Sequence, residues 1–192
     1  MMMRDIFTAP NQLTLLRLIF VPFIIITIFD HHYGWALIIF LVAGVSDGVD
    51  GLLARLLHQR TKLGEYLDPV ADKLLLSTLF IVLSIVGKIN WRVTALVMTR
   101  DVFILVIAAL LYAVTSYRDF RPSLFGKVNT LAQIVTVVAV LLYEVDPMRW
   151  VWYTRRIGMW TVVAMTLLSG FHYLFRVSVG LGRNSDAKAH SA

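Results

Sequence analysis

Four aspartates stand close together in a stretch of the chain that is flanked by very hydrophobic residues. They are Asp47, Asp50, Asp68 and Asp72, and with nearby small and basic residues they form the pattern D-x2-D-G-x2-A-R-x8-G-x3-D-x3-D. Carboxylate oxygens suit hard divalent cations such as Mg²⁺, Mn²⁺ or Ca²⁺. A bound cation would also remove the mutual repulsion of four negative charges. The stretch therefore predicts a metal site that could clamp a phosphoryl group.

Helical spacing would bring these carboxylates together. In a helix, Asp47 and Asp50 fall on one face with the small residues that follow at i+4 and i+7, and Asp68 and Asp72 are one turn apart. The small residues Gly51, Ala54 and Gly64 would leave room beside the acids. A structural interpretation stays open for each residue alone. Asp68, ahead of Pro69, could be a helix cap, and the small residues could be packing contacts.

The composition places this site in a membrane protein. Hydrophobic residues make up 58% of the 192 residues and charged residues only 16%. Apolar runs long enough to cross a hydrocarbon core of about 30 Å recur along the chain. The net charge of +6 therefore indicates topology signals and contact with membrane lipids rather than nucleic-acid binding. The absence of cysteine excludes disulfides, thiolate metal sites and thiol nucleophiles.

The pattern of apolar runs predicts an all-α fold, a polytopic six-transmembrane-helix bundle with a short interfacial segment at residues 1–12. The expected spans are 18–29, 35–50, 68–86, 93–117, 128–143 and 157–175. They form one membrane domain, residues 1–176, followed by a disordered tail at 177–192. The small residues Gly158, Ala164 and Gly170 of the last span could form a homodimer face or serve packing inside the bundle.

Six spans place both termini on one side of the membrane. The basic residues of that side are Arg4, Arg55, Arg60, Lys62, Arg118, Arg121, Lys127, Arg176, Arg183 and Lys188. The opposite side has fewer, namely Lys88, Arg92, Arg149, Arg155 and Arg156. This excess predicts that both termini and the aspartate cluster are cytoplasmic. The expected location is the inner (cell) membrane of a bacterium.

The aspartate pattern resembles the signature of the CDP-alcohol phosphatidyltransferase family, whose eight fixed positions are all present. They are Asp47, Asp50, Gly51, Ala54, Arg55, Gly64, Asp68 and Asp72. Residues 10–17, 67–73 and 126–133 resemble the branch that contains phosphatidylglycerophosphate synthases and cardiolipin synthases. The resemblance implies a six-helix membrane enzyme of phospholipid biosynthesis that uses CDP-diacylglycerol as its donor.

The resemblance also implies roles for the individual residues of the motif. The implied cofactor is Mg²⁺ or Mn²⁺, as two ions held by the four aspartates. The implied CDP-binding residues are Asp47, Gly51, Ala54, Arg55, Gly64 and Asp68. Asp72 is the implied catalytic base, which takes the proton of the acceptor hydroxyl. The hydroxyl oxygen then attacks the phosphorus next to diacylglycerol, and CMP leaves.

The acceptor alcohol is less well marked in the sequence. Arg100 and Lys127 are, by resemblance, the residues expected to bind the phosphate of glycerol 3-phosphate, while an ion pair with Asp101 would also explain Arg100. The same cations would suit phosphatidylglycerol, the acceptor of a cardiolipin synthase. A divalent-cation transporter is an alternative of another class. It would need acids along the depth of several spans, whereas here they are concentrated in one motif.

Overall fold

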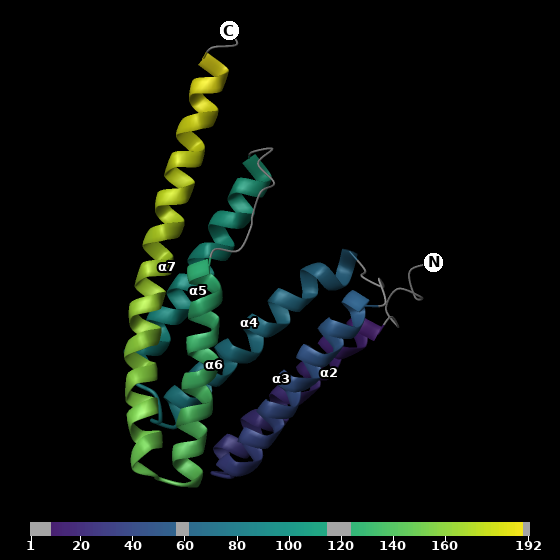
Figure 1. The fold of residues 1–192 in the computed structure, drawn as a ribbon, viewed down its shortest axis with the longest axis vertical. Helices are drawn as coiled ribbons and strands as arrows, with labels where there is room; N and C mark the ends of the chain where they lie inside the picture. Colours follow the sequence, from purple (N-terminus) through teal and green to yellow (C-terminus); the bar gives the residue numbers. More distant parts are fainter. Residues whose placement is uncertain (1–8, 57–61, 115–123, 190–192) are drawn as a thin grey trace. The chain divides into compact units, whose positions relative to one another are not determined.

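A computed structural model describes residues 9–56, 62–114 and 124–189 of the chain, and side chains within 19–46, 73–104, 106 and 126–172 (Figure 1). Every regular element in these ranges is a helix, as the sequence predicts. The helices are α2 (Ala9–Phe29), α3 (Tyr33–Leu56), α4 (Lys62–Ile85), α5 (Trp91–Val114), α6 (Leu124–Val145) and α7 (Arg149–Ala189).

Several helix boundaries differ from the expected spans, and those of α4 and α7 are examples. Helix α4 begins at Lys62, well before the expected start near Asp68. Helix α7 begins at Arg149 and runs to Ala189, so residues 177–189 are helical where the sequence predicted a disordered tail. Hydropathy marks where a chain can enter lipid, whereas a helix continues through polar residues as long as its backbone hydrogen bonds continue. Residues 190–192 lie outside the described residues.

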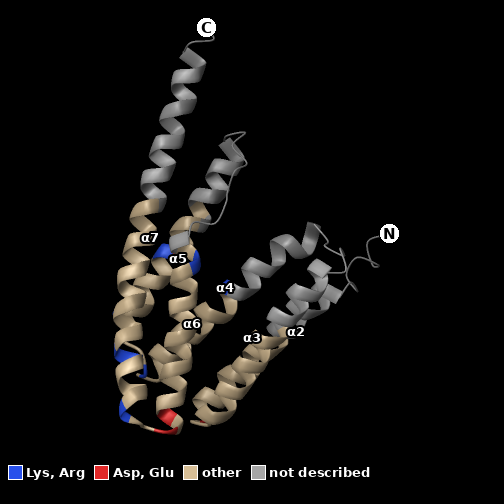
Figure 2. Ribbon diagram, in the orientation of Figure 1, with Lys and Arg blue, Asp and Glu red and all other residues tan. Residues whose placement is uncertain are grey.

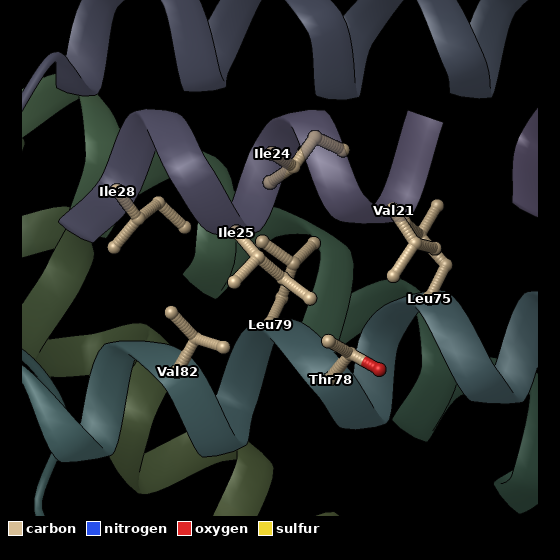
Figure 3. Close-up of a pocket in the computed structure, with 8 residues that line it drawn as sticks. All are labelled: Val21, Ile24, Ile25, Ile28, Leu75, Thr78, Leu79 and Val82. Carbon is tan, nitrogen blue, oxygen red and sulfur yellow. The ribbon is translucent and has the colours of Figure 1, made fainter. Parts of the chain in front are cut away.

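The chain divides into two compact units, residues 1–91 with 137–155, and residues 92–136 with 156–192. In the first unit, α2 packs against both α3 and α4. Where described side chains of α2 and α4 line a gap between the two helices, they are apolar except for one threonine, and the gap is too narrow to admit a water molecule (Figure 3). Its residues are Val21, Ile24, Ile25, Ile28, Leu75, Thr78, Leu79 and Val82. This packing supports α4, the helix that carries Asp68 and Asp72.

Two short turns of the first unit end in residues with a left-handed backbone. His31 has φ 60° and Gly87 has φ 73°. In each turn the next residue closes the helix end, because His32 N–H donates to the Thr27 carbonyl (2.8 Å) and Lys88 N–H donates to that of Leu83 (2.7 Å). These are Schellman-type caps, in which glycine is the usual left-handed residue. His31 is an exception, and its Nδ1 lies 3.0 Å from the Tyr33 hydroxyl.

A cluster of charges ties the α4–α5 turn to the ends of α6 and α7 in the first unit. Lys88 Nζ lies 2.6 Å from Glu144 Oε2, and Arg155 Nη1 lies 3.7 Å from Glu144 Oε1. Arg155 also donates to the Lys88 carbonyl at 2.8 Å, and Lys88 lies over the Tyr33 ring. The hydrogen bond to Glu144 raises the pKa of Lys88 despite the opposing effect of burial. Figure 2 shows acidic residues in red and basic residues in blue near the α6–α7 turn.

In the second unit, α6 and α7 approach closely at Gly158. A Cβ added to Gly158 would lie 2.7 Å from Thr136 Oγ1 and 3.5 Å from the Thr136 Cα. Thr136 is fully buried, so the missing side chain at 158 allows the contact. Gly158 therefore serves packing within the chain, the second of the two roles expected for it. A Cβ at Gly170 would meet nothing within 4 Å.

Large apolar side chains are exposed on every described helix. Phe23, Ile38 and Ile81 are examples, and the most exposed are Trp160 and Phe171, both at 69%. Such a surface suits lipid and not water. One helix in the described residues, Gly126–Val145, is long and apolar enough by itself to cross a membrane, and shorter apolar segments occupy α2, α3 and α4.

Candidate active site

The backbone places the aspartate motif on two helices of the first unit. Positions 47 and 50 lie in α3, and positions 68 and 72 lie in α4. Because each pair is spaced by three or four residues within a continuous helix, its two positions share a helix face. Asp68 lies in the second turn of α4, which begins at Lys62, so the helix-cap explanation for this residue does not apply. The side chains of the motif lie outside the described residues.

No other metal site competes with the motif in the described part of the chain. Among side chains described there, no three His, Asp or Glu residues come close enough together to hold a metal ion. The aspartates therefore stay the predicted ligands. Their chemistry fits a hard divalent cation, since carboxylate oxygens are the ligands such ions take.

Arg100 of α5 belongs to a buried polar layer of the second unit. Its Nη1 lies 2.7 Å from Asp101 Oδ1, and its Nη2 donates a hydrogen bond to Ser169 Oγ of α7. The side chains of Arg100 and Asp101 are only 10% and 8% exposed. The ion pair that the sequence offered as an alternative for Arg100 is thus present. It leaves the guanidinium Nε without an acceptor among the described residues.

Lys127 does not join this layer. Its side chain is exposed, whereas Asn129, two residues further along α6, is fully buried. Two residues correspond to about 200° around a helix, so the two positions lie on opposite faces. A role for Lys127 in binding the acceptor phosphate stays a prediction.

The sequence analysis missed the polar residues of α6 and α7 that complete the layer. Asn129, Gln133, Thr166 and Ser169 are each at most 2% exposed. Thr166 Oγ1 donates to Asn129 Oδ1 at 3.1 Å across the two helices. A signal for them was available, because Asn129 and Gln133 are one turn apart in an otherwise apolar span, and polar residues inside a membrane helix are costly to keep.

A pocket of about 350 Å³ opens in the first unit at the α2–α3 turn. It is lined by residues 31–35 with Ile38, Glu144 and Val145. Its residues come from the ends of α2 and α6 and from the start of α3, whereas the motif occupies the other end of α3. The pocket therefore holds none of the predicted site residues.

Comparison with known proteins identifies the family. The sequence profile of the CDP-alcohol phosphatidyltransferases matches residues 7–168, which include the whole aspartate motif and both helices that carry it. The chain belongs to the CDP-alcohol phosphatidyltransferase family. It is therefore a phosphatidyltransferase enzyme of a membrane-protein family whose members generally depend on divalent metals, and the cation-transporter alternative is set aside.

Three bacterial relatives of similar sequence identity carry different enzyme names and cover different shares of the chain. The chain is 34% identical over 175 residues to a CDP-diacylglycerol–glycerol-3-phosphate 3-phosphatidyltransferase of Salmonella typhimurium, covering 88% of this chain and 93% of the relative. It is 33% identical over 180 residues to a provisionally named phosphatidylglycerophosphate synthase of Mycobacterium tuberculosis, with coverages of 90% and 82%. A provisionally named cardiolipin synthase of the same organism is 33% identical over 144 residues, with coverages of 74% and 68%.

Proposed function

We propose that this enzyme transfers the phosphatidyl group of CDP-diacylglycerol to glycerol 3-phosphate, giving phosphatidylglycerophosphate and CMP. The observation that carries the proposal is the match to the Salmonella relative, which extends over 93% of that protein and over most of this chain. That relative's name states both substrates. The unbroken aspartate motif supports the donor half of the reaction.

A second candidate acceptor is phosphatidylglycerol, which would make the enzyme a cardiolipin synthase. The match to the mycobacterial relative provisionally named for that activity favours it. That match covers 144 residues, against 175 for the Salmonella relative. Both acceptors present a hydroxyl to the same donor, so the two candidates differ in the acceptor subsite and not in the aspartate motif.

In the proposed site, Asp47, Asp50, Asp68 and Asp72 hold two divalent ions, Mg²⁺ or Mn²⁺, and the cytidine diphosphate part lies along Gly51, Ala54, Arg55 and Gly64. When bound, the ions neutralise the diphosphate charge and stabilise the departing CMP. Asp72 accepts the proton of the acceptor hydroxyl as its oxygen bonds to the phosphorus that carries diacylglycerol. The bond from that phosphorus to the bridging oxygen breaks, and its electron pair leaves on CMP.

We further propose that the helices form a six-span bundle in the bacterial cell membrane with both termini in the cytoplasm. The apolar side chains exposed on α2 to α7 support this. In the first unit, Trp35, Trp91, Trp150 and Trp152 lie in the first turns of α3, α5 and α7. An up-and-down bundle would place these turns at one membrane surface, where tryptophan is enriched.

The deciding experiment is a transfer assay with purified protein in detergent micelles. It contains CDP-diacylglycerol, Mg²⁺ or Mn²⁺, and either labelled glycerol 3-phosphate or labelled phosphatidylglycerol, with CMP release measured in parallel. Product with glycerol 3-phosphate alone supports the first proposal, and product with phosphatidylglycerol alone supports the second. If no CMP is released with either acceptor, both proposed acceptors are contradicted.

The role of Asp72 has its own test in the same assay. Asp72→Asn removes a base and a metal ligand with little change in volume, so we expect a loss of transfer of at least about a hundredfold. Asp30→Asn is the control, since Asp30 is an exposed acid in the α2–α3 turn, and it should keep full activity. Wild-type rates in the Asp72 variant would refute the assigned role.

A further inference from the structure

The buried polar layer of the second unit has hydrogen-bond donors that find no acceptor among the described residues. The layer consists of Arg100, Asp101, Asn129, Gln133, Thr166 and Ser169. Within the part of the chain that the structure describes, Arg100 Nε, Asn129 Nδ2 and Gln133 Nε2 are buried and have no acceptor. Each such atom destabilises the folded protein when nothing accepts its hydrogen. Buried polar groups in proteins nearly always have a partner, so these three indicate a ligand or ordered water.

These donors come from neighbouring positions. Asn129 and Gln133 are one turn apart on the same face of α6, and both are at least 99% buried. Thr166 and Ser169, three residues apart on α7, share a face as well. Thr166 bonds to Asn129 and Ser169 bonds to Arg100. Arg100 and Asn129 are therefore both held by the same stripe of α7.

The chemistry of the layer selects the kind of ligand. All three unused atoms are N–H groups, so their partner must be rich in acceptor oxygens. Asp101 already balances the charge of Arg100, so the layer does not need a full negative charge but gains from one. The oxygens of a phosphate ester meet both conditions, and charge-assisted bonds to them are among the strong ones.

We propose that Asn129 and Gln133 join Arg100, the residue that the family resemblance implies for the acceptor phosphate, in binding the phosphate ester of the acceptor alcohol, and that the two amides determine acceptor affinity. This inference rests on the proposed phosphatidyl transfer, in which the acceptor is a phosphate ester, either free glycerol 3-phosphate or the headgroup of phosphatidylglycerol. Asn129 keeps its own oxygen on Thr166 and turns its NH₂ group to the ligand. Gln133 offers a second amide donor one turn deeper along α6.

The test compares Gln133→Met and Asn129→Asp with Thr136→Val. Methionine keeps the length of glutamine but has no N–H group. Aspartate at position 129 keeps a side-chain oxygen that can accept the Thr166 hydrogen bond, and it lacks the NH₂ group of asparagine. Thr136 is the matched control, because it is fully buried on the same face of α6 and its hydroxyl already donates to the Ala132 carbonyl at 2.7 Å.

We expect the two amide variants to raise the KM for the acceptor about tenfold or more, as the loss of a hydrogen bond to a charged group would. The KM for CDP-diacylglycerol should stay unchanged, and Thr136→Val should leave both KM values unchanged. The thermal midpoint of Gln133→Met without acceptor should not fall, because that variant loses a buried N–H group that has no acceptor among the described residues. An unchanged acceptor KM, or an equal loss for both substrates together with a lower midpoint, would overturn the proposal and make the amides packing contacts or water ligands.

Two sets of measurements distinguish failure of this inference from failure of the proposed function. The kinetics are run with glycerol 3-phosphate and with phosphatidylglycerol, and the acceptor whose KM responds is the ligand of the layer. Turnover with phosphatidylglycerol alone, with a KM that rises in the amide variants, would support the layer while refuting transfer to glycerol 3-phosphate. Calorimetric titration of each acceptor into the protein with CDP measures binding without turnover. Absence of binding to the wild type, or equal binding to Gln133→Met, overturns the inference whatever the activity.

Discussion

Replacing Gly158 by alanine should destabilise the protein through a single identified contact. The added Cβ would lie 2.7 Å from Thr136 Oγ1 and 3.4 Å from the Thr136 Cβ. Thr136 cannot easily move aside, because it is fully buried, branched at Cβ and bonded through its hydroxyl to the Ala132 carbonyl. The Thr136 Cα, at 3.5 Å, would be in ordinary van der Waals contact with the added Cβ, so the clash is with the Thr136 hydroxyl.

The size of the effect follows from a comparison with Gly170→Ala in the same helix. Glycine to alanine inside a helix gains about 1 kcal/mol from backbone preference. Gly170→Ala should show that gain alone, since its Cβ meets nothing within 4 Å. Gly158→Ala adds an overpacking cost of about 1–3 kcal/mol. The difference between the two variants therefore isolates the cost of the clash.

The assay is reversible unfolding in mixed micelles, with the thermal midpoint as a second readout. In a chain of this size about 2–4 °C corresponds to 1 kcal/mol. The double variant Gly158→Ala with Thr136→Ala removes the atoms that clash, and should recover at least about 0.5 kcal/mol beyond the sum of the single effects. Equal stability of Gly158→Ala and Gly170→Ala would refute the close approach of α6 and α7 at this point.

Three further predictions concern charge, metal and topology. Lys88→Met should destabilise the protein by a constant amount from about pH 7 to 9. Because the Lys88 pKa is raised above its ordinary 10.5, that difference should shrink as pH rises through the higher folded-state value, and an advantage that persists at high pH would contradict the ion pair with Glu144. Removal of divalent ions with EDTA should abolish transfer, and Mg²⁺ or Mn²⁺ should restore it; transfer that survives EDTA would contradict the metal role. The chain has no cysteine, so His32→Cys and Ser185→Cys report topology cleanly. An impermeant thiol reagent should label only the first in intact cells, and the reverse pattern would invert the proposed orientation.

The sequence alone determined the chemical identity of this protein. The spacings of Asp47, Asp50, Asp68 and Asp72 place each pair on one face of a helix, and their residue types predict binding of divalent metals and phosphate. The family comparison, which matches residues 7–168, confirmed the enzyme class that this pattern predicts. Local periodicity sufficed because helical faces depend only on residue spacing. For the same reason the all-helical fold was predictable from apolar runs.

Contacts between helices were decided only by the tertiary structure. Nothing near Arg100 in the sequence indicates that Ser169 would bond to it, and nothing near Gly158 indicates Thr136. Asn129 and Gln133 lie in a stretch that resembles the family branch, but only their burial and their N–H groups without an acceptor among the described residues place them in a polar layer. Such contacts join residues separated by tens of positions, and their pairing depends on how helices are placed side by side, which no local pattern records.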